Sequence, residues 1–212
     1  MKKRLFKSAL FALALGAMMF NHAQATVLSY NISTDNGFEV YLSTDNSIAG
    51  TPIGSGNWWP TTYNGSSLTL TPGKTYYLHV YGYDEAGIAA FLGQFSLSGT
   101  DHAFANGTNN LLTNTSDWQA SSTGWNTYST PTSLGLNSTT EPWLTVGGGP
   151  RPNIDGTATW IWSGDADANN NAYFTTTIQA VPEPSTTMLM GLGGLGIMAM
   201  TSAKQRKADR IA

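Results

Sequence analysis

The chain of 212 residues contains no cysteine and little charge. Without cysteine it can form no disulfide, and it offers no thiol nucleophile and no zinc-thiolate site. Aspartate, glutamate, lysine and arginine make up only 11% of the sequence. Stretches rich in leucine, glutamate and lysine, which are typical of surface helices, are missing between residues 26 and 180. This composition disfavours a helical fold for that region.

Basic residues are scarce in the same region. Between residues 26 and 180 there are two, Lys74 and Arg151, against eleven aspartates and glutamates. Two cations cannot neutralise a phosphate backbone, so composition argues against nucleic-acid binding and against adhesion to an anionic membrane. A ligand of this region is expected to be neutral, cationic or bridged by a divalent metal.

The first 25 residues have the three parts of a secretory signal peptide. Four basic residues come first: Lys2, Lys3, Arg4 and Lys7. An apolar stretch follows at 9–20, and Ala23-Gln24-Ala25 forms an Ala-x-Ala cleavage site. The apolar stretch is too short to span a membrane comfortably, which argues against the alternative of a permanent N-terminal anchor. We therefore expect a signal helix that engages the Sec export machinery and is removed by signal peptidase after Ala25.

Residues 181–212 begin with Val181-Pro182-Glu183-Pro184, continue with an uncharged apolar stretch at 186–203, and end with a basic segment at 204–210. The two prolines prevent a helix or a central strand from running through the motif. The apolar stretch approaches the length of about 20 residues that a transmembrane helix needs. The basic end then marks the cytoplasmic side of the membrane.

A Pro-Glu-Pro motif, an apolar span and a basic end in this order resemble the PEP-CTERM sorting tail. The resemblance implies recognition at Pro182, Glu183 and Pro184 by an exosortase, a membrane-embedded enzyme similar to cysteine transpeptidases. It also implies export, transient anchoring in the inner membrane by the C-terminus, and a final location at the cell surface or outside the cell. Polysaccharide-rich surroundings are a further implication, which makes exopolysaccharide an expected associate.

Residues 26–180 are long enough for one domain with a sizeable core, and their composition is typical of an all-β protein. Strands are predicted at 38–42, 68–70, 75–83, 88–97 with a break near Gly93, 157–163 and 172–179. The last two are expected to pair, and residues 99–155 are expected to be rich in loops. In the first strand, alternation places Phe38, Val40 and Leu42 on one face.

The segments 35–42, 56–58, 68–74 and 77–92, together with Trp160-Ile161-Trp162 and Tyr173-Phe174, resemble galactose-binding-like jelly-roll domains. This resemblance implies a single β-sandwich over residues 26–180, flanked by the signal helix and the C-terminal transmembrane helix. Such modules accompany enzymes that act on glycosides, so the resemblance also implies sugar binding, although less directly.

All seven tryptophans lie between residues 26 and 180. An aromatic ring can stack on the apolar face of a sugar while polar neighbours bind its hydroxyl groups. The candidate platforms are Trp58 and Trp59, in a loop rich in glycine and asparagine, and one face of the strand at 75–83. That face carries Tyr77, Tyr81 and Tyr83. The alternative is that the tryptophans anchor loops to the core and the tyrosines pack beneath a loop. Trp160 and Trp162 are predicted to be core residues.

A calcium site is a weaker hypothesis. Asp165, Asp167 and Asn169 place side-chain oxygens at alternate positions, as in the first half of a calcium-binding loop. The glycine and glutamate that an EF-hand requires are replaced by Asn170 and Thr176. The alternative is a polar hairpin turn between the last two strands, with no cofactor.

No catalytic motif is present. His79 is predicted in the middle of a strand, and His102 in a loop beside Asp101. Asp84 and Glu85 are adjacent in the chain, so they should point to opposite faces of a strand. We therefore expect no enzyme, and two main classes of function: a surface or matrix protein associated with exopolysaccharide, or a carbohydrate-binding module. A glycan-active enzyme without a recognisable motif is the third.

Overall fold

The computed structural model describes residues 25–182. The signal helix, the transmembrane helix and three of the predicted processing residues, Ala23, Glu183 and Pro184, lie outside these residues. Ala25 and Pro182 lie within them, and both are exposed. No helix in the described part of the chain is long and apolar enough to cross a membrane.

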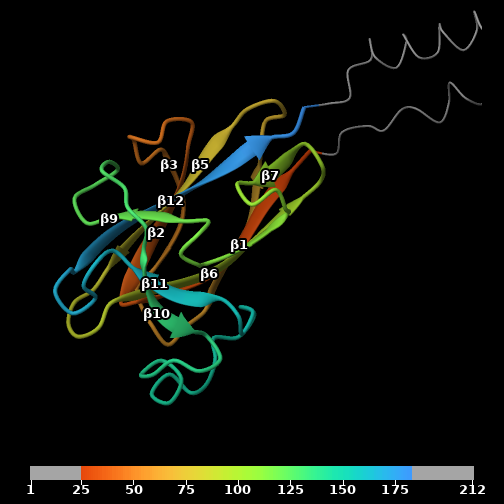
Figure 1. Ribbon diagram of the computed structural model, residues 1–212. Coiled ribbons are helices and arrows are strands. Elements are labelled where there is room, and N and C mark those ends of the chain that lie inside the picture. The colour runs from red at the N-terminus through yellow and green to blue at the C-terminus, as the bar shows by residue number, and fades with distance from the viewer. Residues whose placement is uncertain (1–24, 183–212) are drawn as a thin grey trace, which may run out of the picture. The chain divides into compact units, whose positions relative to one another are not determined.

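The described domain is all-β, with two antiparallel sheets of six strands each (Figure 1). Sheet A has the order β10 (Thr132–Leu136), β11 (Thr159–Trp162), β6 (Ala90–Ser98), β1 (Val27–Asp35) and β4 (Tyr63–Thr69), and β8 (Asn110–Leu112) also pairs with β6. Sheet B has the order β3 (Thr51–Gly56), β2 (Gly37–Ser43), β5 (Tyr76–Tyr83), β12 (Asn171–Ala180) and β7 (His102–Phe104), and β9 (Gln119–Ser121) also pairs with β12.

The two sheets enclose one hydrophobic core, which makes the domain a β-sandwich. Phe91 of sheet A and Phe174 of sheet B meet at the centre, with ring centroids 4.8 Å apart and both side chains fully buried. In β2 the predicted alternation is confirmed, because Phe38, Val40 and Leu42 are buried. Burying each side chain of this size stabilises the fold by about 1.5–3 kcal/mol. The two inner faces therefore hold the sheets together.

A second, smaller hydrophobic cluster lies on the outer face of sheet A. Trp143 stacks on Trp160 with ring centroids 4.6 Å apart, and both pack with buried Ala90, Leu92, Ile154 and Ala158. Trp162 lies instead in the main core, edge-on to Phe174. The prediction that Trp160 and Trp162 are core residues is confirmed, but they belong to different clusters.

The predicted break near Gly93 is wrong, since β6 runs without interruption from Ala90 to Ser98. Gly93 pairs with Ile32 of β1. A Cβ atom at position 93 would lie 2.7 Å from the ring of Phe95. The glycine therefore leaves room for a core aromatic ring and does not end the strand.

Residues 99–155 are rich in loops, as predicted, and also contain the short strands β7, β8, β9 and β10. These strands are only three to five residues long, so they show too little alternation to be recognised. Two further expectations are wrong. His102 belongs to β7 and not to a loop. The last two strands do not pair: β11 belongs to sheet A and β12 to sheet B. Their connection crosses from one sheet to the other, as does the turn at Asn36 between β1 and β2.

Candidate functional site

The adjacent residues Trp58 and Trp59, in the loop between β3 and β4, differ in their environment. The Trp58 side chain is 62% exposed, whereas Trp59 is half-buried and packs against the outer cluster of sheet A. The Trp59 carbonyl accepts a hydrogen bond of 3.0 Å from Ser33 Oγ. These two residues therefore do not form one exposed stacking surface, and Trp58 alone is free to meet a ligand.

Arg151 fixes the other side of this loop. Its guanidinium carbon lies 5.6 Å from the centre of the Trp59 ring, in a cation–π arrangement. Arg151 Nη1 donates to the Pro60 carbonyl at 2.6 Å, and Nη2 donates to the Trp143 carbonyl at 2.7 Å. One of the two cations of the domain is thus buried in the fold and is not available to an anionic ligand.

The three tyrosines predicted as the other platform lie on the outer face of sheet B, on β5. The Tyr81 ring lies 5.0 Å from Tyr173 of β12 and 6.0 Å from Tyr83. Tyr77 is beside His79, with ring centroids 6.2 Å apart. The three tyrosines are half-buried, and His79 between them is fully buried. Sheet B therefore carries an aromatic outer surface that is partly covered.

Trp125, in the loop between β9 and β10, covers part of this surface. Its ring stacks on His79 with centroids 4.4 Å apart and an angle of 17° between the planes. Its edges meet Tyr41 at 6.0 Å and Tyr173 at 5.0 Å. The arrangement agrees with the alternative that this sheet face packs beneath a loop. It also places a half-buried indole that sequence reasoning had not selected.

An open cleft of about 470 Å³ lies beside Trp125. This volume is within the range of about 300–1,000 Å³ that is typical of small-ligand sites. Its aromatic walls are Tyr77, Trp125 and Tyr128, and the polar residues that line it are Thr44, Asp45, Asn46, Ser47 and Asn126. We call this feature the Trp125 cleft. It combines aromatic surface with hydroxyl, amide and carboxylate groups.

Asn46 organises the floor of the Trp125 cleft. Its Oδ1 accepts a hydrogen bond of 2.6 Å from Thr175 Oγ1 and lies 3.1 Å from His79 Nε2. Its carbonyl accepts a hydrogen bond of 2.9 Å from the Tyr128 hydroxyl. These contacts join the β2–β3 loop to β5, to β12 and to the β9–β10 loop. The cleft is therefore held open by the fold itself.

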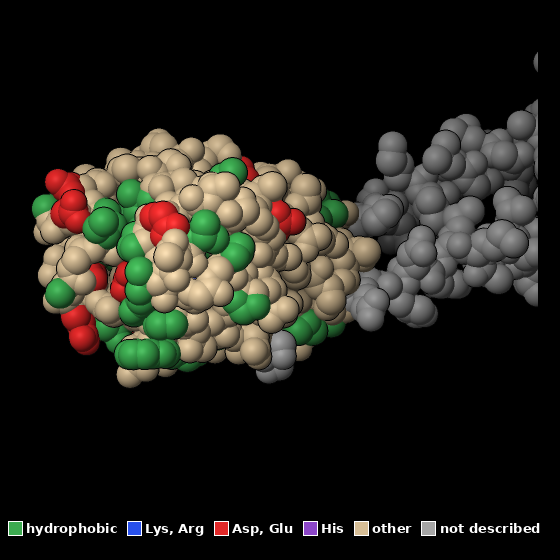
Figure 2. Space-filling view, turned by 90° about the horizontal axis from the view of Figure 1, so that it is seen from below, with side chains coloured by type: hydrophobic (Ala, Val, Ile, Leu, Met, Phe, Trp, Pro, Cys, Tyr) green, Lys and Arg blue, Asp and Glu red, His purple; other side chains and the backbone are tan. Residues whose placement is uncertain are grey.

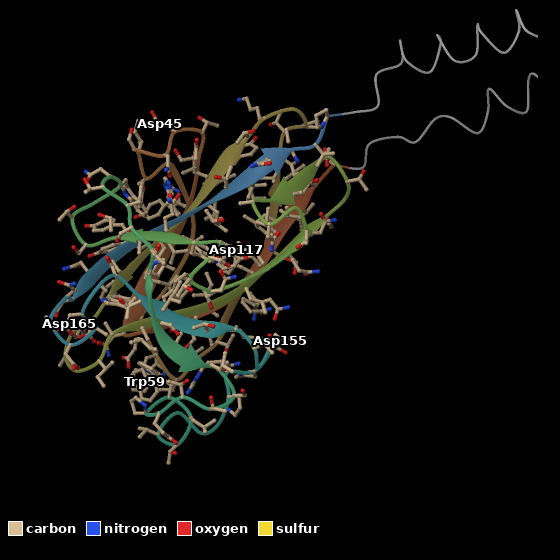
Figure 3. All side chains as sticks on the ribbon, in the orientation of Figure 1. Asp45, Trp59, Asp117, Asp155 and Asp165 are labelled. Carbon is tan, nitrogen blue, oxygen red and sulfur yellow. The ribbon has the colours of Figure 1, made fainter. Side chains whose placement is uncertain are left out.

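The charge around the cleft is negative. Asp45 is exposed, and hydrogen bonds from the backbone and side chain of Ser47 hold the pKa of its carboxyl below the ordinary value. Among residues 25–182, no lysine or arginine lines the cleft. Figure 3 shows Asp45 and Trp59 at opposite ends of the domain, so the cleft and the Trp58 loop are separate surfaces. On the face shown in Figure 2, acidic side chains are scattered over the surface and no lysine or arginine is visible.

The predicted calcium residues lie in the turn between β11 and β12. Asp165 Oδ1 accepts a hydrogen bond from the Asp167 nitrogen at 3.0 Å, and the Asn169 amide donates to the Ser163 carbonyl at 2.8 Å. The Asn169 carbonyl accepts from Trp162 Nε1 at 2.7 Å. Within residues 25–182, no group of three or more His, Asp or Glu side chains is placed to hold a metal ion. Calcium binding stays a prediction, at a turn that joins two sheets and is not a hairpin.

The residues considered for catalysis differ in burial and do not form a common site. His102 is buried in β7, and its Nε2 lies 2.9 Å from the Lys74 carbonyl. Asp84 is buried while Glu85 is exposed, as expected for adjacent residues at a strand end. Neither His102 with its neighbour Asp101, both buried, nor Asp84 with Glu85 offers two accessible side chains directed at one point.

The sequence contains one signal for the cleft. Trp125 lies in the segment Ser121-Ser122-Thr123-Gly124-Trp125-Asn126, a polar loop with one large aromatic residue. Trp58 and Trp59 lie in a loop of the same kind. What the sequence does not contain is the placement of this loop over β5, because that depends on pairing between β9 and β12.

Comparison with known protein families gives a match at the C-terminal end of the chain. The PEP-CTERM protein-sorting motif matches residues 180–206, which include the Pro-Glu-Pro motif and the apolar span. The match supports an exported chain that is held transiently in a membrane and sorted by an exosortase. No curated protein and no solved structure matches the chain.

Proposed function

We propose that this chain is a cell-surface or extracellular-matrix protein that associates with exopolysaccharide once an exosortase has processed its tail. The observation that carries the proposal is the sorting motif at 180–206, attached to a single β-sandwich. The acidic domain has one exposed cation, Lys74, and so is suited to a neutral polymer better than to an anionic one. The galactose-binding-like and jelly-roll resemblance is a further argument for a glycan partner.

A second, more specific proposal is that the domain binds carbohydrate in the Trp125 cleft. Trp125 and Tyr77 offer aromatic surface, and Asp45, Asn46 and Asn126 offer groups that can bind sugar hydroxyls. The Asn46 side chain is already held by Thr175 and His79, so binding requires little ordering of the cleft. This cleft replaces the Trp58-Trp59 loop as the favoured site, because Trp59 is part of the packing around Arg151.

Binding at one such cleft should be weak. An aromatic contact contributes about 0.5–1.5 kcal/mol beyond the area that it buries. Affinity for a polymer would come from many copies of the protein on one surface, each holding the same chain. Because stacking and neutral hydrogen bonds are little affected by salt, retention should persist at high ionic strength.

The test is retention of the exported chain on exopolysaccharide purified from the producing cells, in low and high salt. The matched variants are Trp125→Ala in the cleft and Trp58→Ala in the exposed loop, with urea unfolding as the control for folding. The proposal expects salt-resistant retention that Trp125→Ala abolishes and Trp58→Ala does not. Loss with Trp58→Ala instead would contradict the cleft, and loss with a chelator would favour a bridging metal near Asp165. Release of reducing ends from the polymer would show an enzyme.

A further inference from the structure

The start of the described domain is unusually well buried. Thr26, one residue before β1, is fully buried, whereas its neighbour Ala25 is exposed. The Thr26 carbonyl accepts a hydrogen bond of 2.8 Å from the Leu70 nitrogen. Its hydroxyl donates to Oδ1 of Asp101, which lies 75 residues further along the chain. The burial therefore begins at the residue that follows the predicted Ala-x-Ala cleavage site.

Asp101 is a carboxylate that lacks a cationic partner. It is 3% exposed, and its Oδ2 has no hydrogen-bond partner in the described part of the chain. Within residues 25–182, the only ionisable nitrogen at ion-pair distance is His102 Nδ1, 3.8 Å from Oδ1. His102 Nδ1 is itself buried and makes no hydrogen bond to the described residues. Burial raises the pKa of the Asp101 carboxyl, but hydrogen bonds from Thr26 and from its own backbone, together with nearby His102, hold this pKa below the ordinary value. The site therefore favours a charged carboxylate, and its unpartnered oxygen can accept a further cation.

Besides His102, the backbone nitrogen of Thr26 is a group that can supply a positive charge to this carboxylate. Covalent geometry keeps the nitrogen of a threonine about 3–4 Å from its own Oγ1. Because Oγ1 is hydrogen-bonded to Asp101, the nitrogen lies no more than about 7 Å from the same carboxylate oxygen, within reach of an ion pair after a small adjustment of the chain end. It makes no backbone hydrogen bond within residues 25–182. While it belongs to a peptide bond this nitrogen is neutral.

We propose that cleavage between Ala25 and Thr26 completes the site, because the α-ammonium group that it releases pairs with the Asp101 carboxylate. A signal peptidase hydrolyses the Ala25–Thr26 amide with one water molecule. Ala25 leaves with the new carboxylate, and the Thr26 nitrogen takes up a proton to become the ammonium. Export would thus add an ion pair to a buried carboxylate that has no lysine or arginine partner among residues 25–182.

The pair would also connect the two ends of the domain. Asp101 precedes β7, and in β7 the backbone of His102 pairs with that of Ala180, the last residue of β12. Ala180 is where the match to the sorting motif begins. The mature N-terminus would therefore be tied to the short strand that holds the residue preceding the tail. Removal of the signal peptide would stabilise the base of the tail.

The test uses the exported chain as the producing cells release it. Intact mass should show a first residue of Thr26. The α-amine is then acylated at pH 7 with a limiting amount of an N-hydroxysuccinimide ester, and its rate is compared with that of the exposed Lys74 amine in the same molecule. An ion pair that raises the pKa of the α-amine by one unit slows its acylation about tenfold. Asp101→Asn should remove this protection, and the exposed matched control Asp155→Asn should not.

The ion pair can also be tested in the wild-type chain alone, should Asp101→Asn fail to fold. The pH dependence of acylation gives the pKa of the α-amine in the wild-type chain, folded and in urea. The proposal requires a folded pKa above the ordinary range of about 7.7–8.0 and a return to that range in urea. A chain that begins at another residue, or an α-amine that titrates in the ordinary range when folded, would overturn the proposal.

Discussion

The indole of Trp125 lies flat on the imidazole of His79, with an angle of 17° between the two planes. The contact joins the β9–β10 loop to the middle of β5 and leaves His79 fully buried. His79 Nδ1 lies 3.2 Å from the Ala49 carbonyl, so the ring also holds the β2–β3 loop. One histidine thus supports both loops that form the Trp125 cleft. Its protonation should affect the stability of the whole arrangement.

Acidification should destabilise the domain through His79. Burial lowers the pKa of His79 below its ordinary value of 6.5, although hydrogen bonds and Asp45 oppose the shift. Below pH 6.5 the unfolded chain then binds a proton that the folded chain does not, so the free energy of unfolding falls as pH falls. Urea unfolding between pH 7.5 and 5.5 measures this slope. His79→Gln should give a shallower slope than the wild type, and equal slopes would refute the assignment.

Titration of Asp35 should change the stability of the domain with pH in the direction opposite to that of His79. Burial is the largest cause that raises the pKa of Asp35 to about 6, against a hydrogen bond from Trp143 Nε1 of 2.8 Å that lowers it. The stability that protonated Asp35 contributes is therefore fully present below about pH 3.8, the ordinary pKa, and is lost as pH rises through about 6.

Asp35→Asn keeps an acceptor for Trp143 and removes the charge. After allowance for partial exposure of the group, we expect it to stabilise the domain by about 1–2 kcal/mol at pH 8. The gain should disappear at pH 3.5. Asp45→Asn is the matched control, because Asp45 is exposed and its pKa is lowered. A stabilisation of equal size in both variants would point to net charge as the cause and would contradict a specific effect at Asp35.

Replacing Trp58 and replacing Trp59 should have different effects on the free energy of unfolding. Trp58 is 62% exposed, so Trp58→Ala should change the free energy of unfolding by no more than about 0.5 kcal/mol. Trp59 packs against the outer cluster of sheet A and beneath Arg151, so Trp59→Ala should destabilise the domain by about 1–3 kcal/mol. Urea midpoints of the two single variants decide the matter. Similar losses in both would show that the exposed indole also contributes to packing.

Long runs of alternating apolar residues in the sequence are sufficient to predict strands at the centre of the fold. Alternation along the sequence predicts β5, which is eight residues long, and the buried set Phe38, Val40 and Leu42 follows from the same reasoning. A strand is also predicted where β12 lies. β1 also alternates, with Leu28 and Ile32 buried, but serine and asparagine on its other positions concealed it. β3 contains Pro52 and two glycines, which are tolerated because it is an edge strand.

The remaining features depend on contacts between distant segments, which no local pattern encodes. At Asn36 the chain passes from sheet A to sheet B, and no local pattern in the sequence specifies this passage. The Trp125 cleft needs three separate segments to meet, at Asn46, Tyr77 and Trp125. The hydrogen bond between Thr26 and Asp101 spans 75 residues, so its existence could not be derived from spacing.

Sorting should depend on the Pro-Glu-Pro motif. Glu183 is the charged residue of that motif, which lies within the matched segment 180–206. A protease-like enzyme that recognises a stiff, extended motif needs its one polar side chain for binding, so Glu183→Ala should accumulate as an unprocessed membrane-bound precursor. Cell fractionation and intact mass distinguish this precursor from the processed chain. Glu141→Ala, which removes an exposed acid of the folded domain, is the matched control and should mature normally. Normal processing of the Glu183→Ala chain would show that the motif is read by its prolines alone, or is not read at all.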